Sequence, residues 1–239
     1  MQHTVNPNIA ALGTILSIWA HPDDESFSCA GIMCAARANG QNVVCVTATK
    51  GEAGVQDESR WPADQLGEIR AEEMAEALQI LGITQHYWLG YQDGHVAEVP
   101  ESDAIERLKA LIRLYQPNTI LTFGPEGMTG HPDHCAISSF VMQAAAETSA
   151  TVYHAVQLRS RYEHLKAADE RFNIFFNIDQ PPLIEETQAA ILFELPEECL
   201  IKKLAALQAM PSQTEAILTA IGPDVLKEML GVEVFVRAR

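Results

Sequence analysis

Two short stretches, far apart in the chain, place histidines beside acidic residues and a proline. The sequence "AHPDDE" covers residues 20–25 and "GHPDH" covers residues 130–134. Imidazole and carboxylate groups are ligands that zinc and similar divalent metals accept, and a catalytic zinc site has three protein ligands and one position left for water. We therefore expect His21, Asp24 and His134 to form a metal site.

Two further side chains of these motifs, which are not among the expected metal ligands, could transfer protons or donate hydrogen bonds. The carboxylate of Asp23 is suited to take a proton from water, and the imidazole of His131 is suited to assist an oxyanion or a leaving group. Zinc lowers the pKa of a bound water from 15.7 to about 7. At about 1.4 kcal/mol per pKa unit, this is on the order of 12 kcal/mol of help in making hydroxide. Hydrolysis of an amide at neutral pH becomes feasible at such a site.

Helix capping is the simpler alternative for each motif. The acids Asp23, Asp24 and Glu25 suit the N-terminus of a helix that begins near Ser26, and proline with aspartate is also common at helix starts. Each motif, however, lies in the loop that follows a predicted strand. Two separate His-Pro-Asp loops at the same edge of one sheet favour a functional site over capping alone.

Alternating strands and helices must position these loops. Hydrophobic patterns predict strands at residues 14–20, 43–49, 85–94, 118–124 and 151–158, and helices at residues 27–41, 63–83, 103–116 and 133–148. This alternation predicts an α/β fold with a mostly parallel sheet and helices on both faces. In such sheets ligands bind at the carboxyl ends of the strands, where both motifs fall.

The remaining residues are less regular. Residues 171–182 are predicted to form an edge strand that ends at Pro181 and Pro182, residues 197–209 a helix, and residues 232–239 a final strand. Because the chain contains no low-complexity segment or linker, residues 1–239 are expected to form a single domain.

The composition limits which binding partners and which cellular location we expect. The 32 acidic and 16 basic residues give a formal net charge of −16, which argues against nucleic acid as a partner. No apolar segment approaches the length of about 20 residues that crosses a bilayer, so membrane insertion is not expected. The N-terminus lacks the pattern of a signal peptide, and the five cysteines are scattered without a C-x-x-C pair. These features predict a cytoplasmic protein with reduced thiols.

Together, "AHPDDE" and "GHPDH" resemble the zinc-dependent N-deacetylases of the LmbE-like, or PIG-L, family. The intervening "VTATKGEAG", "IRAEEMAEALQILGI" and "LGYQDG" fit the order and spacing of that family. The resemblance implies a Rossmann-like sheet and hydrolysis of the N-acetyl group of a small N-acetylglucosamine-containing molecule or conjugate, which yields acetate and an amine. It also implies Zn²⁺, with Fe²⁺ as an alternative, held by His21, Asp24 and His134.

The resemblance further implies roles for the other polar residues. Asp23 would be the general base, and His131 would stabilise the oxyanion. Either His131 or protonated Asp23 would then protonate the leaving nitrogen. Arg70 and Asp93 match positions that line the sugar site in some members, although they equally fit an exposed helix charge and a turn aspartate.

Two departures from the family pattern concern substrate contacts. Thr129 stands where some members carry tyrosine, and Met210 stands where many carry histidine, while Ser212 and Gln213 are retained. Alternatives therefore stay open: a hydrolase of another small N-acyl amide or ester on the same scaffold, or a non-catalytic protein that binds a metal or a sugar. The sequence also leaves open the aglycone of the substrate and whether the protein forms a homo-oligomer.

Overall fold

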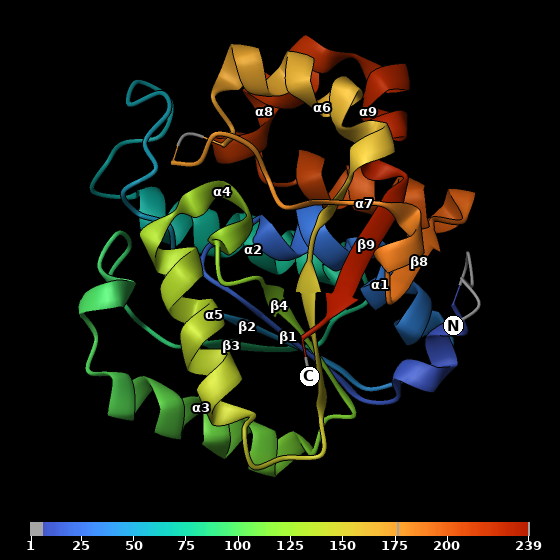
Figure 1. Ribbon diagram of the computed structural model, residues 1–239. Coiled ribbons are helices and arrows are strands. Elements are labelled where there is room, and N and C mark those ends of the chain that lie inside the picture. Colours follow the sequence, from blue (N-terminus) through green and yellow to red (C-terminus); the bar gives the residue numbers. More distant parts are fainter. Residues whose placement is uncertain (1–6, 176, 239) are drawn as a thin grey trace.

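A seven-stranded sheet forms the centre of the molecule (Figure 1). The computed structural model describes residues 7–175 and 177–238. The strand order is β3-β2-β1-β4-β5-β9-β8. The first five strands run parallel, and β9 pairs antiparallel with both β5 and β8. The strands are β1 (Ile15–Trp19), β2 (Val43–Thr47), β3 (Gln85–Trp88), β4 (Thr119–Phe123), β5 (Thr151–Ala155), β8 (Ile191–Glu194) and β9 (Val232–Arg237).

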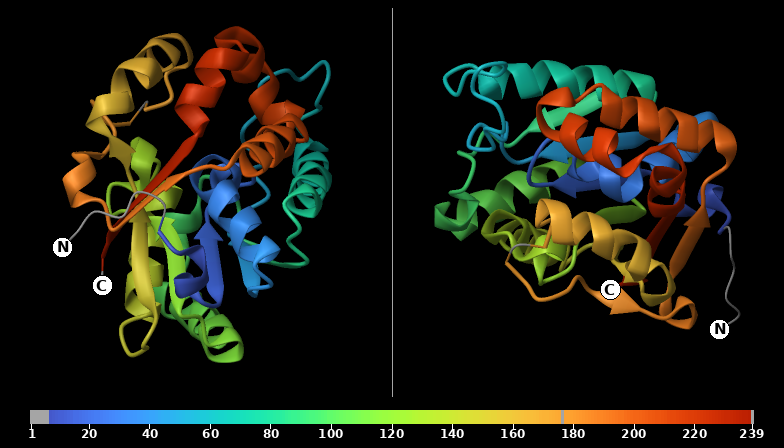
Figure 2. Two further views of the ribbon diagram at one scale, coloured as in Figure 1. Left: turned by 90° about the vertical axis from the view of Figure 1, so that its right-hand side faces the viewer. Right: turned by 90° about the horizontal axis from the view of Figure 1, so that it is seen from above.

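Helices cover both faces of this sheet, which confirms the predicted α/β class (Figure 2). One face carries α1 (Asp24–Ala38), α2 (Leu66–Ile80) and α7 (Glu197–Gln208), and the other carries α3 (Glu101–Tyr115) and α5 (Pro132–Ala144). The short helix α4 (Gly127–Gly130) precedes α5. Beyond the carboxyl edge of the parallel strands lie α6 (Arg159–Phe172), α8 (Pro211–Ile221) and α9 (Pro223–Leu230).

Smaller elements complete the described part of the chain. Three are short 3₁₀ helices: η1 (Ile9–Leu12), η2 (Val96–Glu98) and η3 (Glu186–Gln188). The strands β6 (Gln157–Leu158) and β7 (Leu183–Ile184) pair parallel in a separate two-stranded sheet. Among the described residues, no helix is long and apolar enough to cross a membrane.

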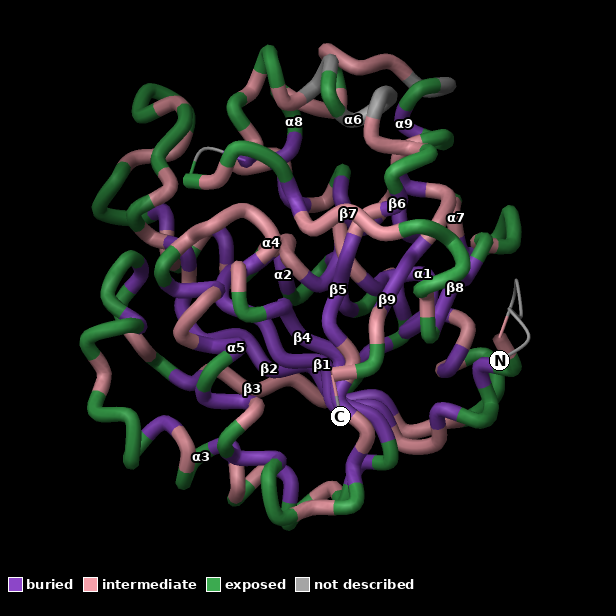
Figure 3. Tube along the Cα trace, in the orientation of Figure 1, coloured by how far each residue is buried: buried purple, intermediate pink, exposed green. Residues whose placement is uncertain are grey.

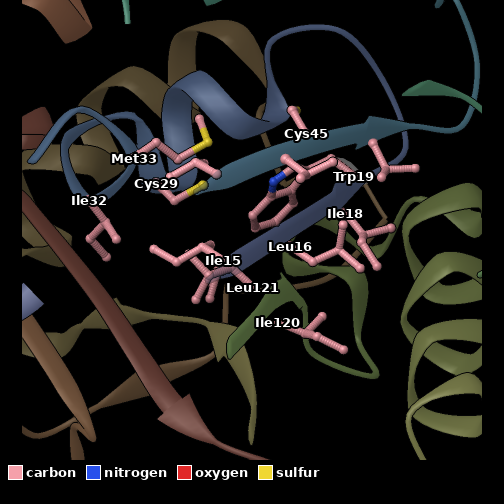
Figure 4. Close-up of a cluster of buried hydrophobic side chains, with 14 of the residues drawn as sticks. Ile15, Leu16, Ile18, Trp19, Cys29, Ile32, Met33, Cys45, Ile120 and Leu121 are labelled. Atoms are coloured by element: carbon pink, nitrogen blue, oxygen red, sulfur yellow. The ribbon is translucent and has the colours of Figure 1, made fainter. Parts of the chain in front are cut away.

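The central strands are buried along their whole length (Figure 3). Every residue of β1, β2 and β4 is buried, as expected for parallel strands that are covered on both faces. Figure 4 shows Ile15, Leu16, Ile18 and Trp19 of β1 among side chains from α1, β2 and β4. This rigid core fixes the loops that leave its carboxyl edge.

The strand order reverses between β1 and β4. The chain leaves β1 toward β2 and leaves β4 toward β5, on the opposite side of the sheet. Loops that leave neighbouring strands in opposite directions open a crevice at their carboxyl ends, where α/β proteins bind ligands. His21 lies two residues after β1, and His131 follows β4 through the short helix α4. Both motifs therefore lie at this crevice.

Helix α1, which begins at Asp24, is interrupted at Cys29 (φ −147°, ψ 15°). The interruption leaves backbone groups of the helix without helical partners, and a buried ion pair satisfies them. The carboxylate of Glu233 accepts hydrogen bonds from the backbone N–H groups of Gly31 (2.7 Å) and Ile32 (2.8 Å). The ammonium of Lys203 donates to the carbonyl of Phe27 and to Glu233, both at 2.8 Å.

Lys203→Met is expected to destabilise the protein by about 3–5 kcal/mol, because removing one partner of a buried ion pair leaves an uncompensated charge. The side chains of Lys203 and Glu233 are each only 1% exposed. Chemical denaturation measures the loss. The matched control is Lys202→Met, which removes the exposed pair of Lys202 with Glu198 and should cost at most about 1 kcal/mol. Equal effects of the two substitutions would contradict the role of the buried pair.

The C-terminal third departs most from the sequence expectations. The predicted edge strand at residues 171–182 is wrong for the described residues of that range, because α6 continues to Phe172 and the strand β7 begins only after the prolines, at Leu183. Residue 176 lies outside the described residues. The predicted helix at residues 197–209 and the final strand from residue 232 are confirmed as α7 and β9. Strand β8 and helices α6, α8 and α9 were not predicted.

Candidate active site

Three predicted metal ligands converge at the crevice between β1 and β4. Nδ1 of His21 lies 3.0 Å from Nε2 of His134 and 3.7 Å from Oδ2 of Asp24. The second carboxylate oxygen of Asp24 lies 3.5 Å from Nε2 of His134. One nitrogen of each imidazole and the carboxylate of Asp24 thus face a common point. Two loops that are more than a hundred residues apart in the sequence bring these side chains together.

Hydrogen bonds fix which nitrogen of each histidine faces that point. Nε2 of His21 lies 3.0 Å from the carboxylate of Asp93 and 3.3 Å from that of Asp133, so this nitrogen carries a proton that the two acids hold. Nδ1 of His134 donates to the carbonyl of Gly127 at 2.9 Å. Partners of this kind orient metal-ligating histidines and make them more basic. They leave Nδ1 of His21 and Nε2 of His134 directed at the candidate site.

The charges around the two imidazoles suit a cation. Burial acts to lower the pKa of His21, but hydrogen bonds to Asp133 and Asp93 and the charge of Asp24 outweigh it and raise this pKa to about 10. The acids therefore favour a positive charge at this place. Burial lowers the pKa of His134 to about 4, which keeps its imidazole neutral and able to ligate. The donor set of two imidazoles and a carboxylate fits a divalent metal such as zinc.

Asp133 is a residue of this site that the sequence analysis did not select. Its carboxylate is fully buried and accepts hydrogen bonds from the backbone N–H groups of Gly94 (2.8 Å) and Val96 (3.1 Å), besides its contact with His21. It thereby ties the loop after β3 to the histidine that follows β1. Its position inside "HPDH" was the available signal, but aspartate at a helix start is common enough to conceal it.

Asp133→Asn is expected to weaken metal binding about 10–100-fold, because an amide group lacks the charge that holds the Nε2 proton of His21. Competition titration of the metal-free protein against a chelator measures the affinity. Asp103→Asn makes the same change at an exposed position of α3 and should leave affinity unaltered. Unchanged affinity in a folded Asp133→Asn protein would contradict the role of Asp133.

Asp23 occupies a strained position beside the converging ligands. Its φ of 103° lies in a region that few non-glycine residues adopt. Its side chain is 20% exposed, and one carboxylate oxygen lies 3.4 Å from a guanidinium nitrogen of Arg70. Burial raises the pKa of Asp23 to about 7, and the charge of Arg70 acts against that rise. A carboxyl with a pKa near neutrality is suited to accept and return a proton.

His131 lies at the start of α5, where its Nδ1 accepts a hydrogen bond from the backbone N–H of Asp133 at 3.1 Å. Its ring centroid is 4.7 Å from that of His21 and 5.1 Å from that of His134. One ring nitrogen of each of these three histidines lies within 4.8 Å of the others, so His131 is also close enough to be a metal ligand. Burial lowers the pKa of His131.

Arg70 and Asp93, which we predicted at the sugar site, contact the loops that follow β1 and β2. The guanidinium of Arg70 donates to the carbonyls of Pro22 and Gly51, each at 2.7 Å. Asp93 accepts a hydrogen bond from the N–H of Ala53 at 2.9 Å besides its contact with His21. Both side chains are buried. Their contacts are with protein groups, and a role toward the substrate stays a prediction.

A cavity of about 580 Å³ opens from the candidate metal site. Asp23, Asp24 and His134 line one end of it, together with Thr129. Gln213 lines it as well, whereas Met210 is buried in the core. The residue that replaces tyrosine in the second motif thus borders this cavity, and the residue that replaces histidine does not.

The fold and the converging donors define an α/β protein with a candidate metal-dependent hydrolytic site. Residues 16–145 match the model of the PIG-L family, described as GlcNAc-PI de-N-acetylase. The chain belongs to the PIG-L family. It is 29% identical over 263 residues to the 1D-myo-inositol 2-acetamido-2-deoxy-alpha-D-glucopyranoside deacetylase of Acidothermus cellulolyticus, an alignment that covers 95% of this chain and 89% of the relative.

Solved structures with other activities share the fold. The N,N'-diacetylchitobiose deacetylase of Pyrococcus horikoshii matches with a TM-score of 0.63 and 22% identity, over 94% of this chain and 83% of that one. The 4-carboxy-2-hydroxymuconate hydratase of Pseudomonas putida KT2440 matches with a TM-score of 0.65 and 16% identity, over 95% and 96%. Since a deacetylase and a hydratase both have this fold, the reaction must be argued from the site.

Proposed function

We propose that this protein is a metal-dependent hydrolase that removes the N-acetyl group from a small N-acetylglucosamine-containing molecule or conjugate and releases acetate and a free amine. The convergence of His21, Asp24 and His134, with the carboxylate of Asp23 next to them against Arg70, is the observation that carries the proposal. Membership of the PIG-L family and the inositol glycoside deacetylases among its relatives support it.

In this proposal His21, Asp24 and His134 hold Zn²⁺, with Fe²⁺ as the alternative, because two imidazoles and one carboxylate suit both ions. The metal supplies Lewis acidity, which polarises the amide carbonyl and lowers the pKa of water. The carboxylates of Asp93 and Asp133 hold the Nε2 proton of His21, and the carbonyl of Gly127 holds the Nδ1 proton of His134. The protein thereby presents both ligating nitrogens in one orientation.

Asp23 acts as the general base. Its carboxylate takes a proton from the attacking water, and the protonated carboxyl can return that proton to the nitrogen that leaves. Arg70 stands 3.4 Å from it and limits how far burial raises its pKa, so a fraction of Asp23 is ionised near pH 7. His131, whose ring centroid lies 4.7 Å from that of His21 and 5.1 Å from that of His134, donates a hydrogen bond to the oxyanion that forms as the carbonyl is attacked.

A substrate screen combined with metal analysis tests the proposal. Purified protein loaded with Zn²⁺ or Fe²⁺ is assayed for acetate release from N-acetylglucosamine, its inositol glycoside and N,N'-diacetylchitobiose, and from N-acetylated amino acids as non-sugar amides. The expected result is acetate release from the sugars that depends on the metal. Release from the amino acids alone would favour a different N-acyl amide as substrate. Tight sugar binding without acetate release at saturating metal would identify a binding protein instead.

A further inference from the structure

The cavity that opens from the candidate metal site is apolar over most of its wall. At its far end the lining comes from the C-terminal elements, which are outside the family match at residues 16–145. That end is lined by Ile217, Leu218, Ile221, Leu226, Met229 and Leu230 of α8 and α9. Leu226 and Leu230 are 8% and 6% exposed, and Ile217 and Met229 are half-buried. Helices α8 and α9 therefore present mainly apolar side chains to the cavity.

Strands close the same cavity from below. Val156, Leu158 and Val234 line it and are buried in a small apolar cluster at the junction of the two sheets. Glu233 also lines the cavity, but its carboxylate is engaged by Lys203 and by the N–H groups of Gly31 and Ile32. Because the carboxylate accepts hydrogen bonds from these protein donors, it does not require a polar group of the ligand. This part of the cavity thus suits an apolar group.

The size of the cavity exceeds what an acetylated amino sugar needs. Its volume of about 580 Å³ falls in the range of about 300–1,000 Å³ that is typical of sites for drug-sized ligands. The polar groups of a sugar and its acetamide match the end lined by Asp23, Asp24 and His134. Gln157, Arg161 and Asn173 also line the cavity, and the guanidinium of Arg161 donates to the carbonyl of Glu228. Along α8 and α9, a polar aglycone such as inositol would place its hydroxyl groups against apolar side chains, where they would lose hydrogen bonds to water.

We propose that the substrate carries an apolar aglycone, an alkyl or aryl group, which lies between α8, α9 and the strands β6 and β9. This inference rests on the proposed deacetylase function, and names the substrate class of the same site. The acyl group that is cleaved is acetyl, so the apolar group belongs to the other side of the sugar. Each methylene group of the aglycone that becomes fully buried is expected to raise kcat/KM by up to about fourfold.

The test compares aglycones with the metal-loaded protein. Acetate release is measured from methyl, octyl and inositol glycosides of N-acetylglucosamine, and fatty acid release from N-octanoylglucosamine. The octyl glycoside is expected to have a kcat/KM about 100-fold above that of the methyl glycoside, because several methylene groups become buried. Equal values for methyl, octyl and inositol glycosides would overturn the inference while the proposed deacetylase function stands. Release of the octanoyl group in preference to acetate would overturn the assignment to the aglycone.

A pair of variants tests the location. Ile217→Asp places a charge on the apolar wall, and the ratio of kcat/KM between the octyl and methyl glycosides should fall about tenfold or more. Thr219→Asp adds the same group at an exposed position of the same helix, away from the cavity, and should leave the ratio unaltered. An unchanged ratio in a folded Ile217→Asp protein would overturn the location. If no glycoside releases acetate with any metal, the proposed function itself fails, which is a separate outcome.

Discussion

Asp23→Asn is expected to retain a bound metal and to lose about 10³-fold in kcat, because an amide cannot take a proton from water and general base catalysis contributes about 10²–10⁴-fold. Asparagine is the informative replacement since Asp23 has a φ of 103°, which asparagine tolerates better than alanine. Asp23→Ala should lose turnover as well, with added backbone strain. The neutral side chain also keeps an oxygen for the guanidinium of Arg70.

Metal content and single-turnover rates, measured on the same sample, show whether Asp23 acts as a general base or, like its neighbour Asp24, as a metal ligand. The matched control is Asp64→Asn, which makes the same change at an exposed position outside the site. It should retain both metal and activity. Full activity of Asp23→Asn would remove Asp23 from the proposed mechanism. Loss of the metal instead would make Asp23 a ligand, and the base would then have to be sought elsewhere among the groups at this end of the cavity.

The parallel half of the fold followed from the sequence because its signals are local. Buried parallel strands are continuous apolar runs, and the amphipathic helices between them end near glycines such as Gly40 and Gly82. The carboxyl ends of those strands then had to meet at one edge, which predicted that the two His-Pro-Asp loops would meet. The structure confirms that both motifs lie at that edge.

The C-terminal third could not be predicted as well, because its contacts are made with distant parts of the chain. Strand β8 is only four residues long and takes its place in the sheet through β9, its antiparallel partner. Residues 171–182 combine aromatic residues with two prolines, a pattern that resembles an edge strand, yet α6 extends into this stretch from upstream. Local propensity does not reveal such tertiary preferences.

Within the site, the sequence identified the groups that could ligate a metal but not the groups that orient them. Asp133 contacts His21 from a position 112 residues later in the chain, and the carbonyl of Gly127 holds His134 with no side-chain signal at all. Arg70 was selected for the substrate but is engaged with two backbone carbonyls. Backbone partners of this kind depend on loop conformation, which residue types alone do not determine.

His134→Ala is expected to lose both the metal and all measurable turnover, whereas His131→Ala, three residues earlier in the same motif, should retain about one metal ion per chain and lose about 10²-fold in kcat. The contrast matters because both histidines lie close enough to His21 to ligate with it. His134 faces Asp24 with Nε2 and has its Nδ1 proton held by Gly127, whereas Nδ1 of His131 accepts a hydrogen bond from the start of α5.

Metal content after dialysis, measured for both variants and for the exposed control His95→Ala, decides between the two ligand sets. Loss of metal in His131→Ala with retention in His134→Ala would assign the metal to His131 and contradict the set of His21, Asp24 and His134. Replacement of His134 also removes its stacking on Phe123, where the ring centroids are 4.1 Å apart. His134→Gln, which is closer in size, should therefore lose the metal with a smaller loss of thermal stability than His134→Ala, because metal affinity depends on the imidazole nitrogen and core packing depends on side-chain volume.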